Sequence, residues 1–163
     1  MIKSAATIQD QISVGVNKGV ASALNIYANM HVELFDENGN LKDERHIKNT
    51  VTTAGKNGIA DQVLAAPTLA KMGWMAIGTG TPAATLLGVE AARVAFDSKL
   101  RSGAVVTVVA TFPAGTGTGA ITEAGTFNIA TANTVDMWMS ASFSVVNKAA
   151  LDSIVITWTL TVS

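Results

Sequence analysis

The sequence contains no cysteine and few charged residues, and both absences narrow the classes of protein that fit it. Without cysteine, the chain has no disulfide bond, no thiolate zinc site and no cysteine nucleophile. Charged residues make up 14% of the chain, whereas about 25% is typical of a soluble domain. The net charge of −1 argues against nucleic acid as a partner, because nucleic-acid-binding proteins carry a basic surface.

Long apolar runs are also missing. No segment approaches the roughly 18 consecutive apolar residues of a membrane-spanning helix, so we expect no membrane partner. The first residues lack the apolar core of a secretory signal peptide, which predicts synthesis and assembly in the cytoplasm. We expect the low charge to reflect apolar surface that is buried between subunits.

Alternating apolar residues predict strands over most of the chain. The clearest stretch, residues 104–127, reads AVVTVVATFPAGTGTGAITEAGTF, with alternate residues apolar up to Phe112. Pro113 ends this strand because proline donates no hydrogen bond to a ladder, and a second strand begins at Ile121. We therefore predict a long β-hairpin with a glycine-rich tip over residues 104–129.

The same alternation predicts an all-β fold. Further strands are expected at 25–35, 41–52, 71–80, 89–96, 135–145 and 153–162. Thr53–Ala66 predicts one short helix with Thr53 as its N-cap, weakened in its first turn by Gly55 and Gly58, and residues 98–103 predict a turn. About eight strands indicate an antiparallel β-sandwich domain over residues 25–163. A jelly roll is one topology that fits, and the strand order stays open. The expected core residues are Trp74, Phe112, Phe127, Phe143, Ile156 and Trp158.

Residues 1–24 are expected to form an arm outside the main core. Their apolar residues recur every fourth position, which favours a helical stripe. Glycines and β-branched residues within the same segment favour an extended arm instead, and both alternatives stay open. The residues expected to contact a neighbouring subunit are Ile8, Ile12, Val16 and Val20.

The first predicted hairpin holds much of the charge and both histidines of the chain. Its Asn38-Gly39 turn places His31 opposite His46, with Glu33 and Glu44 nearby. This set sketches a metal site, but two histidines on a charged hairpin are usually solvated surface residues. We therefore predict no metal and no cofactor.

Three charged residues stand in otherwise apolar segments. If Glu123 is buried, its carboxylate needs a partner, and we expect a structural ion pair with Arg93, with Glu90 nearby. The turns around Gly78 and Gly115 resemble phosphate loops only superficially, because no helix follows them. Glycoside hydrolysis would need two glutamates in an open cleft lined by aromatic residues, and no Gly-x-Ser-x-Gly motif is present. We predict that the chain is not an enzyme.

Three segments carry a resemblance to a known group of proteins. They read WMAIGTGTPAATLLGVEAARVAF from Trp74, VATFPAGTGTGAITEAGTFN from Val109 and SFSVVNKAALDSIVITWTLTV from Ser142. These segments resemble small structural proteins of tailed bacteriophages, and the resemblance covers about residues 36–162. It implies a non-enzymatic virion component that is assembled in the host cytoplasm.

Within that group, we expect a capsid decoration or cement protein. Such a protein binds as an oligomer, here expected to be a homotrimer, to the major capsid protein. The alternative is an adaptor in the tail, baseplate or neck, with other tail or neck proteins as partners. A third hypothesis, a carbohydrate-binding module, would need aromatic side chains exposed on loops.

Overall fold

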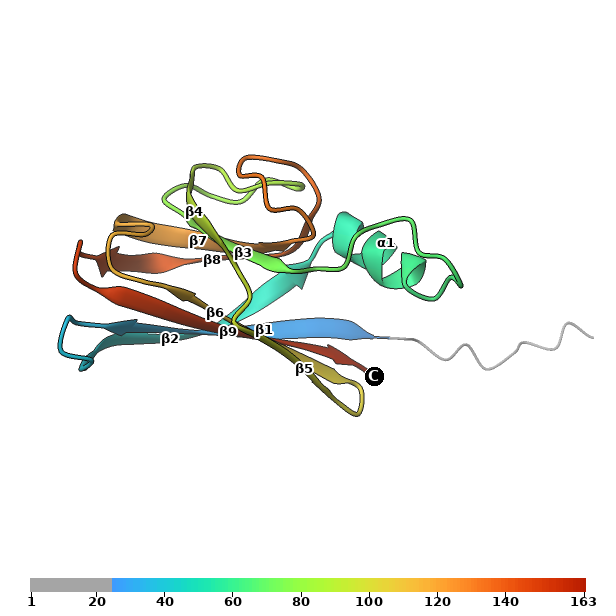
Figure 1. Ribbon diagram of the computed structural model, residues 1–163, viewed down its shortest axis with the longest axis horizontal. Helices are drawn as coiled ribbons and strands as arrows, with labels where there is room; N and C mark the ends of the chain where they lie inside the picture. The colour runs from blue at the N-terminus through green and yellow to red at the C-terminus, as the bar shows by residue number, and fades with distance from the viewer. Residues whose placement is uncertain (1–24) are drawn as a thin grey trace, which may run out of the picture.

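The computed structural model describes residues 25–163, which form one continuous antiparallel sheet and a single helix (Figure 1). The elements are β1 (Ile26–Phe35), β2 (Leu41–Val51), α1 (Thr53–Asp61), β3 (Trp74–Gly78), β4 (Glu90–Ala95), β5 (Ser98–Ser102), β6 (Val105–Phe112), β7 (Gly119–Phe127), β8 (Met137–Lys148) and β9 (Ser153–Val162). The strands lie in the order β4-β3-β7-β8-β2-β1-β9-β6-β5.

The sheet turns a corner at β2. Most of β2 pairs with β1, but its last residues, Thr50 and Val51, pair with Ser140 and Met139 of β8. The sheet therefore curls over, so that β4, β3, β7 and β8 face the other five strands across the core (Figure 1). The predicted all-β antiparallel class is confirmed. The arrangement, however, is a nine-stranded half-barrel rather than a sandwich of about eight strands, because a strand that passes from one layer to the other joins them into one sheet.

The predicted hairpin over residues 104–129 is wrong. β6 pairs with β9 and β5, whereas β7 pairs with β3 and β8. The segment between them crosses from one layer to the other, with Gly115 and Gly117 at φ values of 77° and 67°. Apolar and polar residues alternate in the same way in two strands of a hairpin and in two strands that face each other across a core. The sequence pattern therefore did not distinguish a β6–β7 hairpin from two strands in opposite layers.

Residues 98–103, predicted as a turn, mostly form the edge strand β5. Its sequence, SKLRS, has little apolar alternation because most of its side chains are exposed. Pairing with β6 makes it a strand. Only Phe96 and Asp97 separate β5 from β4, although these are the two edge strands of the sheet.

The helix α1 lies against β8 because it carries two glycines on one face. A Cβ atom at Gly55 would lie 2.1 Å from the carbonyl oxygen of Trp138, and one at Gly58 would lie 2.2 Å from Cζ2 of its indole. The N-cap is Thr52 rather than Thr53, and its hydroxyl accepts a hydrogen bond from the Gly55 amide at 3.0 Å. The helix ends at Asp61, earlier than predicted.

The core fills the space between the two layers. Among the residues predicted there, Phe112, Phe127, Ile156 and Trp158 are fully buried. Phe143 is half-buried against the main cluster, and Trp74 is half-buried against a smaller cluster around Phe127. The predicted arm residues Ile8, Ile12, Val16 and Val20 lie outside the described residues.

Candidate functional site

Glu123 on β7 is fully buried and holds the loop between β3 and β4. Its Oε1 accepts hydrogen bonds from the amides of Gly80 at 2.9 Å and Val89 at 2.8 Å, and its Oε2 accepts one from Gly88 at 2.8 Å. A buried carboxylate is tolerated only when its oxygens are hydrogen-bonded. Here the donors come from both ends of the loop, Gly80 at one end and Gly88 and Val89 at the other. The Glu123 side chain therefore fixes the position of the loop.

Glycine is required around this carboxylate. A Cβ atom at Gly78 would lie 2.4 Å from Oε1 of Glu123, and one at Gly88 would lie 2.4 Å from the carbonyl oxygen of Thr81. The Gly78-x-Gly80 turn therefore supplies one of three backbone amides that bind an anion, as amides do in a phosphate loop. That anion is a carboxylate of the chain itself, which makes the motif structural.

Arg93 is not the partner of Glu123 that we expected. Its guanidinium forms two hydrogen bonds of 2.8 Å with Glu90, and both side chains are 2% exposed. The guanidinium also donates to the carbonyl oxygen of Ile129 and lies 3.6 Å from the centre of the Phe127 ring. The isolated charges in the sequence identified the three residues but not how they pair. The partners of Glu123 are backbone amides, which the identity of the residues in the sequence does not reveal.

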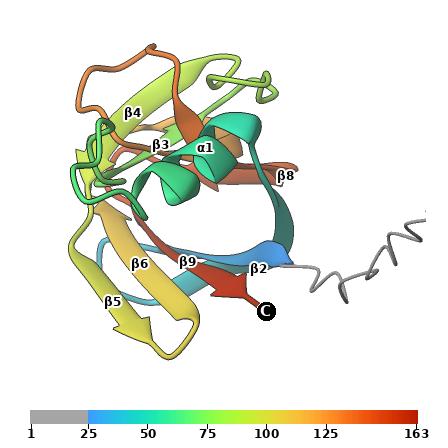
Figure 2. The same ribbon diagram turned by 90° about the vertical axis from the view of Figure 1, so that its right-hand side faces the viewer.

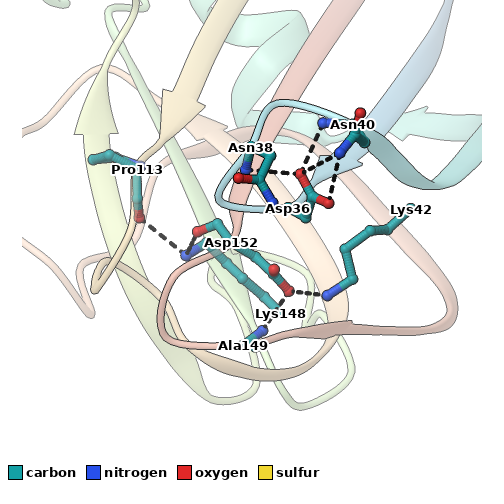
Figure 3. A network of polar contacts seen from close by, with 8 residues as sticks. All are labelled: Asp36, Asn38, Asn40, Lys42, Pro113, Lys148, Ala149 and Asp152. Atoms are coloured by element: carbon teal, nitrogen blue, oxygen red, sulfur yellow. Dashed lines mark hydrogen bonds and ion pairs between the residues drawn. The ribbon is translucent and has the colours of Figure 1, made fainter.

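A second buried charge, Lys148, stabilises the end of the half-barrel away from α1 (Figures 1 and 3). Its Nζ donates to the carbonyl oxygens of Asp152 at 2.6 Å and Pro113 at 3.0 Å. Burial lowers the pKa of Lys148, and the nearby Asp152 opposes that shift. The hydrogen bond from Lys42 to the Asp152 carboxylate, 2.7 Å long, lowers the pKa of Asp152. The network joins the β1–β2 hairpin, the β8–β9 hairpin and the β6–β7 crossing.

The two histidines face each other on the outer surface of β1 and β2. The predicted register is confirmed, since His31 lies directly opposite His46. Their rings stack with centroids 4.3 Å apart. Oε1 of Glu44 lies 2.7 Å from Nε2 of His31 and 3.3 Å from Nε2 of His46. The hydrogen bond with His31 lowers the pKa of Glu44.

An apolar groove is lined by residues of α1, β5, β6 and β9. Figure 2 shows these elements from the end of the half-barrel at which α1 lies. The groove encloses about 560 Å³. Met72, Trp138 and Leu160, each under a tenth exposed, line it together with Leu100, which is 70% exposed. Lys71, Lys99 and Arg101 also line it and supply its positive charge.

The groove was missed by the sequence analysis because its lining comes from five separate segments. One signal was present. Gly55 and Gly58 are spaced to share a face of α1 and allow the helix to approach Trp138 closely. We interpreted them only as residues that weaken a helix, whereas a pair of glycines on one face also indicates close packing.

Within residues 25–163, no helix is both long and apolar enough to cross a membrane. Comparison of the chain with protein families, curated proteins and solved structures finds no match.

Proposed function

We propose that the chain is a non-enzymatic structural protein of a tailed-bacteriophage virion, and more specifically a capsid decoration protein that binds as a homotrimer to the major capsid protein. The proposal rests on the sequence resemblance, and the apolar groove beside α1 is the structural observation that supports it best. An apolar groove of this kind is suited to receive a segment of a neighbouring subunit. The occupant that we propose is residues 1–24 of a second copy.

The position of Asn25 supports this occupant. Its amide donates to the carbonyl oxygen of Ser163 at 2.6 Å, and Ile26 pairs with Val162, which lines the groove. Asn25, to which residues 1–24 are bonded, therefore lies at the end of the sheet where the groove is. Twenty-four residues reach at most about 80 Å when extended, which is enough to cross to a neighbouring subunit.

The apolar residues of the two surfaces also match, although the segment carries Lys3 and Lys18 as well as one acidic residue. The segment carries apolar residues at regular spacing, which match the apolar floor formed by Met72, Trp138 and Leu160. Its single acidic residue, Asp10, lies between Ile8 and Ile12. The cations that line the groove would offer Asp10 an ion-pair partner.

The tryptophans give the carbohydrate-binding alternative no exposed ring on a loop, and Tyr27, which is 50% exposed, lies on strand β1. Sugar recognition needs aromatic rings open to solvent, but Trp138 is 6% exposed and Trp158 is fully buried. Trp74 is half-buried against the smaller core cluster. All three tryptophans of the chain thus serve packing.

The oligomeric state tests the groove. In light scattering of the full chain after gel filtration, Leu100→Glu should convert the oligomer to a monomer, because it removes the exposed apolar side chain that would contact the apolar residues of the segment. Ile12→Glu should have the same effect from the side of the segment. Leu151→Glu is the matched control, since Leu151 is 61% exposed outside the groove, and it should leave the oligomer intact. A monomeric wild-type chain, or an oligomer insensitive to Leu100→Glu, would contradict the proposed exchange of segments.

The place in the virion is tested by the copy number per particle, from quantitative mass spectrometry of purified virions against the major capsid protein. Hundreds of copies in a simple ratio to the capsid protein would support decoration of the shell. A handful of copies would instead favour the tail, baseplate or neck. Absence from the particle would contradict a virion role.

A further inference from the structure

We infer that the outer face of β1 and β2 carries a binding site for a divalent transition-metal ion, formed by His31, Glu44 and His46. The site is independent of the groove and of the proposed virion role. Imidazole nitrogens and a carboxylate oxygen are ligands that suit Zn²⁺. Zn²⁺ is therefore the probe that we choose.

The backbone register places the three ligands together. His31 and His46 lie directly opposite each other on adjacent antiparallel strands. Glu44 is two residues before His46 and therefore projects from the same face of β2. One ligand atom from each residue lies within 4.8 Å of the others. The rigid part of the site is thus fixed by the sheet.

The distances between ligand atoms are close to those in a zinc site. Oε1 of Glu44 lies 2.7 Å from Nε2 of His31 and 3.3 Å from Nε2 of His46. In a tetrahedral site with zinc–ligand bonds of about 2.0–2.1 Å, neighbouring ligand atoms lie about 3.3–3.4 Å apart. The Glu44 oxygen therefore already lies near both histidine nitrogens. Small movements of the three side chains would let all three atoms bind one ion.

Binding requires the two rings to turn. They are now parallel to within 2°, so their nitrogen lone pairs run side by side and do not converge on one point. The side chains of His46 and Glu44 are 75% and 45% exposed. They can rotate into solvent without disturbing the core. A hollow of about 400 Å³ lies beside the two histidines and is lined by them and Thr157, but not by Glu44.

The neighbouring charges favour a cation. Glu33 lies directly opposite Glu44, and two facing carboxylates repel each other across a strand pair. Oε2 of Glu33 also lies 3.8 Å from Nδ1 of His31. The 2.7 Å contact between His31 and Glu44 is a hydrogen bond that Nε2 of His31 donates to the carboxylate, so Zn²⁺ binding at Nε2 would displace this proton. Two lysines at alternate exposed positions of β2 oppose the attraction of a cation: Lys48 beside the histidines, and Lys42, which pairs with Asp152.

The composition of the chain makes the test unambiguous. The sequence contains only these two histidines and no cysteine. Any zinc binding through imidazole must therefore come from this site. We would titrate the full chain with ZnCl₂ by calorimetry and follow the two imidazole signals by NMR. We expect one ion per chain and a shift of both imidazole signals.

Three variants decide the assignment. His46→Ala should weaken Zn²⁺ binding by 10-fold or more, because it removes a ligand. Glu33→Gln should weaken it less than His46→Ala does, because it removes a neighbouring negative charge but no ligand. Lys48→Ala is the control on the same exposed face, and its affinity should equal or exceed that of the wild type. Equal affinities of the wild type and His46→Ala would overturn the site, as would imidazole signals that do not respond to Zn²⁺.

Discussion

Replacing Glu123 with glutamine tests whether a single buried carboxylate holds the β3–β4 loop. Glutamine has nearly the same shape, and its oxygen can still accept from Gly80 and Val89. Its amide NH₂ group, however, would face the Gly88 amide, which now donates to Oε2 at 2.8 Å. Two donors would then meet in a buried site, and the charge on all three hydrogen bonds would be lost.

The expected loss follows from those bonds. A hydrogen bond to a charged group contributes about 1.5–3 kcal/mol, and a buried donor left without an acceptor costs about 1–3 kcal/mol. Glu123→Gln should therefore lower the free energy of unfolding by about 3–5 kcal/mol. Glu123→Ala should lower it further, because all three amides lose their acceptor.

Urea denaturation measures this loss directly, provided that the slope against urea stays unchanged. The control is Glu37→Gln, which removes the same charge from the exposed β1–β2 turn and should change stability by less than about 0.5 kcal/mol. Hydrogen exchange should locate the effect in the amides of Gly80, Gly88 and Val89. A loss below about 1 kcal/mol for Glu123→Gln, with those amides still protected, would refute the reasoning.

Three further predictions concern packing and pH. Gly58→Ala should lower the free energy of unfolding by about 1–3 kcal/mol in urea denaturation, because the added Cβ would overlap Trp138. This loss should appear even though alanine favours a helix by about 1 kcal/mol over glycine. A more stable variant would show that α1 can shift away from Trp138. Trp158→Ala should cost about 3–5 kcal/mol, since the side chain is fully buried, and a loss below about 1 kcal/mol would show that the core refills the space. The lowered pKa of Asp152 means that its contribution to stability is present above the unfolded-state pKa, about 3.8, and is lost as the pH falls through the lower folded-state value. The drop in unfolding free energy measured from pH 7 to pH 2 should accordingly be smaller in Asp152→Asn, and an identical drop in both proteins would contradict the role of the Lys42 pair.

Local features of the fold could be predicted from the sequence, whereas its long-range pairings could not. The Asn38-Gly39 turn fixes the register of β1 and β2, so the opposition of His31 and His46 followed from a count of residues. The layer to which β6 belongs depends on contacts with β9. Alternation reports only which face of a strand is buried, not which strand lies beside it.

The candidate sites also differ in how far the sequence could predict them. Glu123 stood out because a carboxylate among apolar residues needs a partner. Its partners were backbone amides, which every residue except proline supplies, so the sequence could not identify them. The groove depends on side chains such as Met72 and Leu160, which are distant in sequence and show no shared pattern.

The pairing of β1 with β9 has a consequence for how the chain folds. These strands come from opposite ends of the described chain, yet they lie side by side in the middle of one layer. Synthesis must reach Val162 before this layer can close, and until then the apolar faces of β1 and β6 lack their shared neighbour. Such distant contacts slow folding and prolong the exposure of unpaired strands. In a growing chain, the β1 and β6 edges that β9 will cover therefore stay open until the last strand has been made.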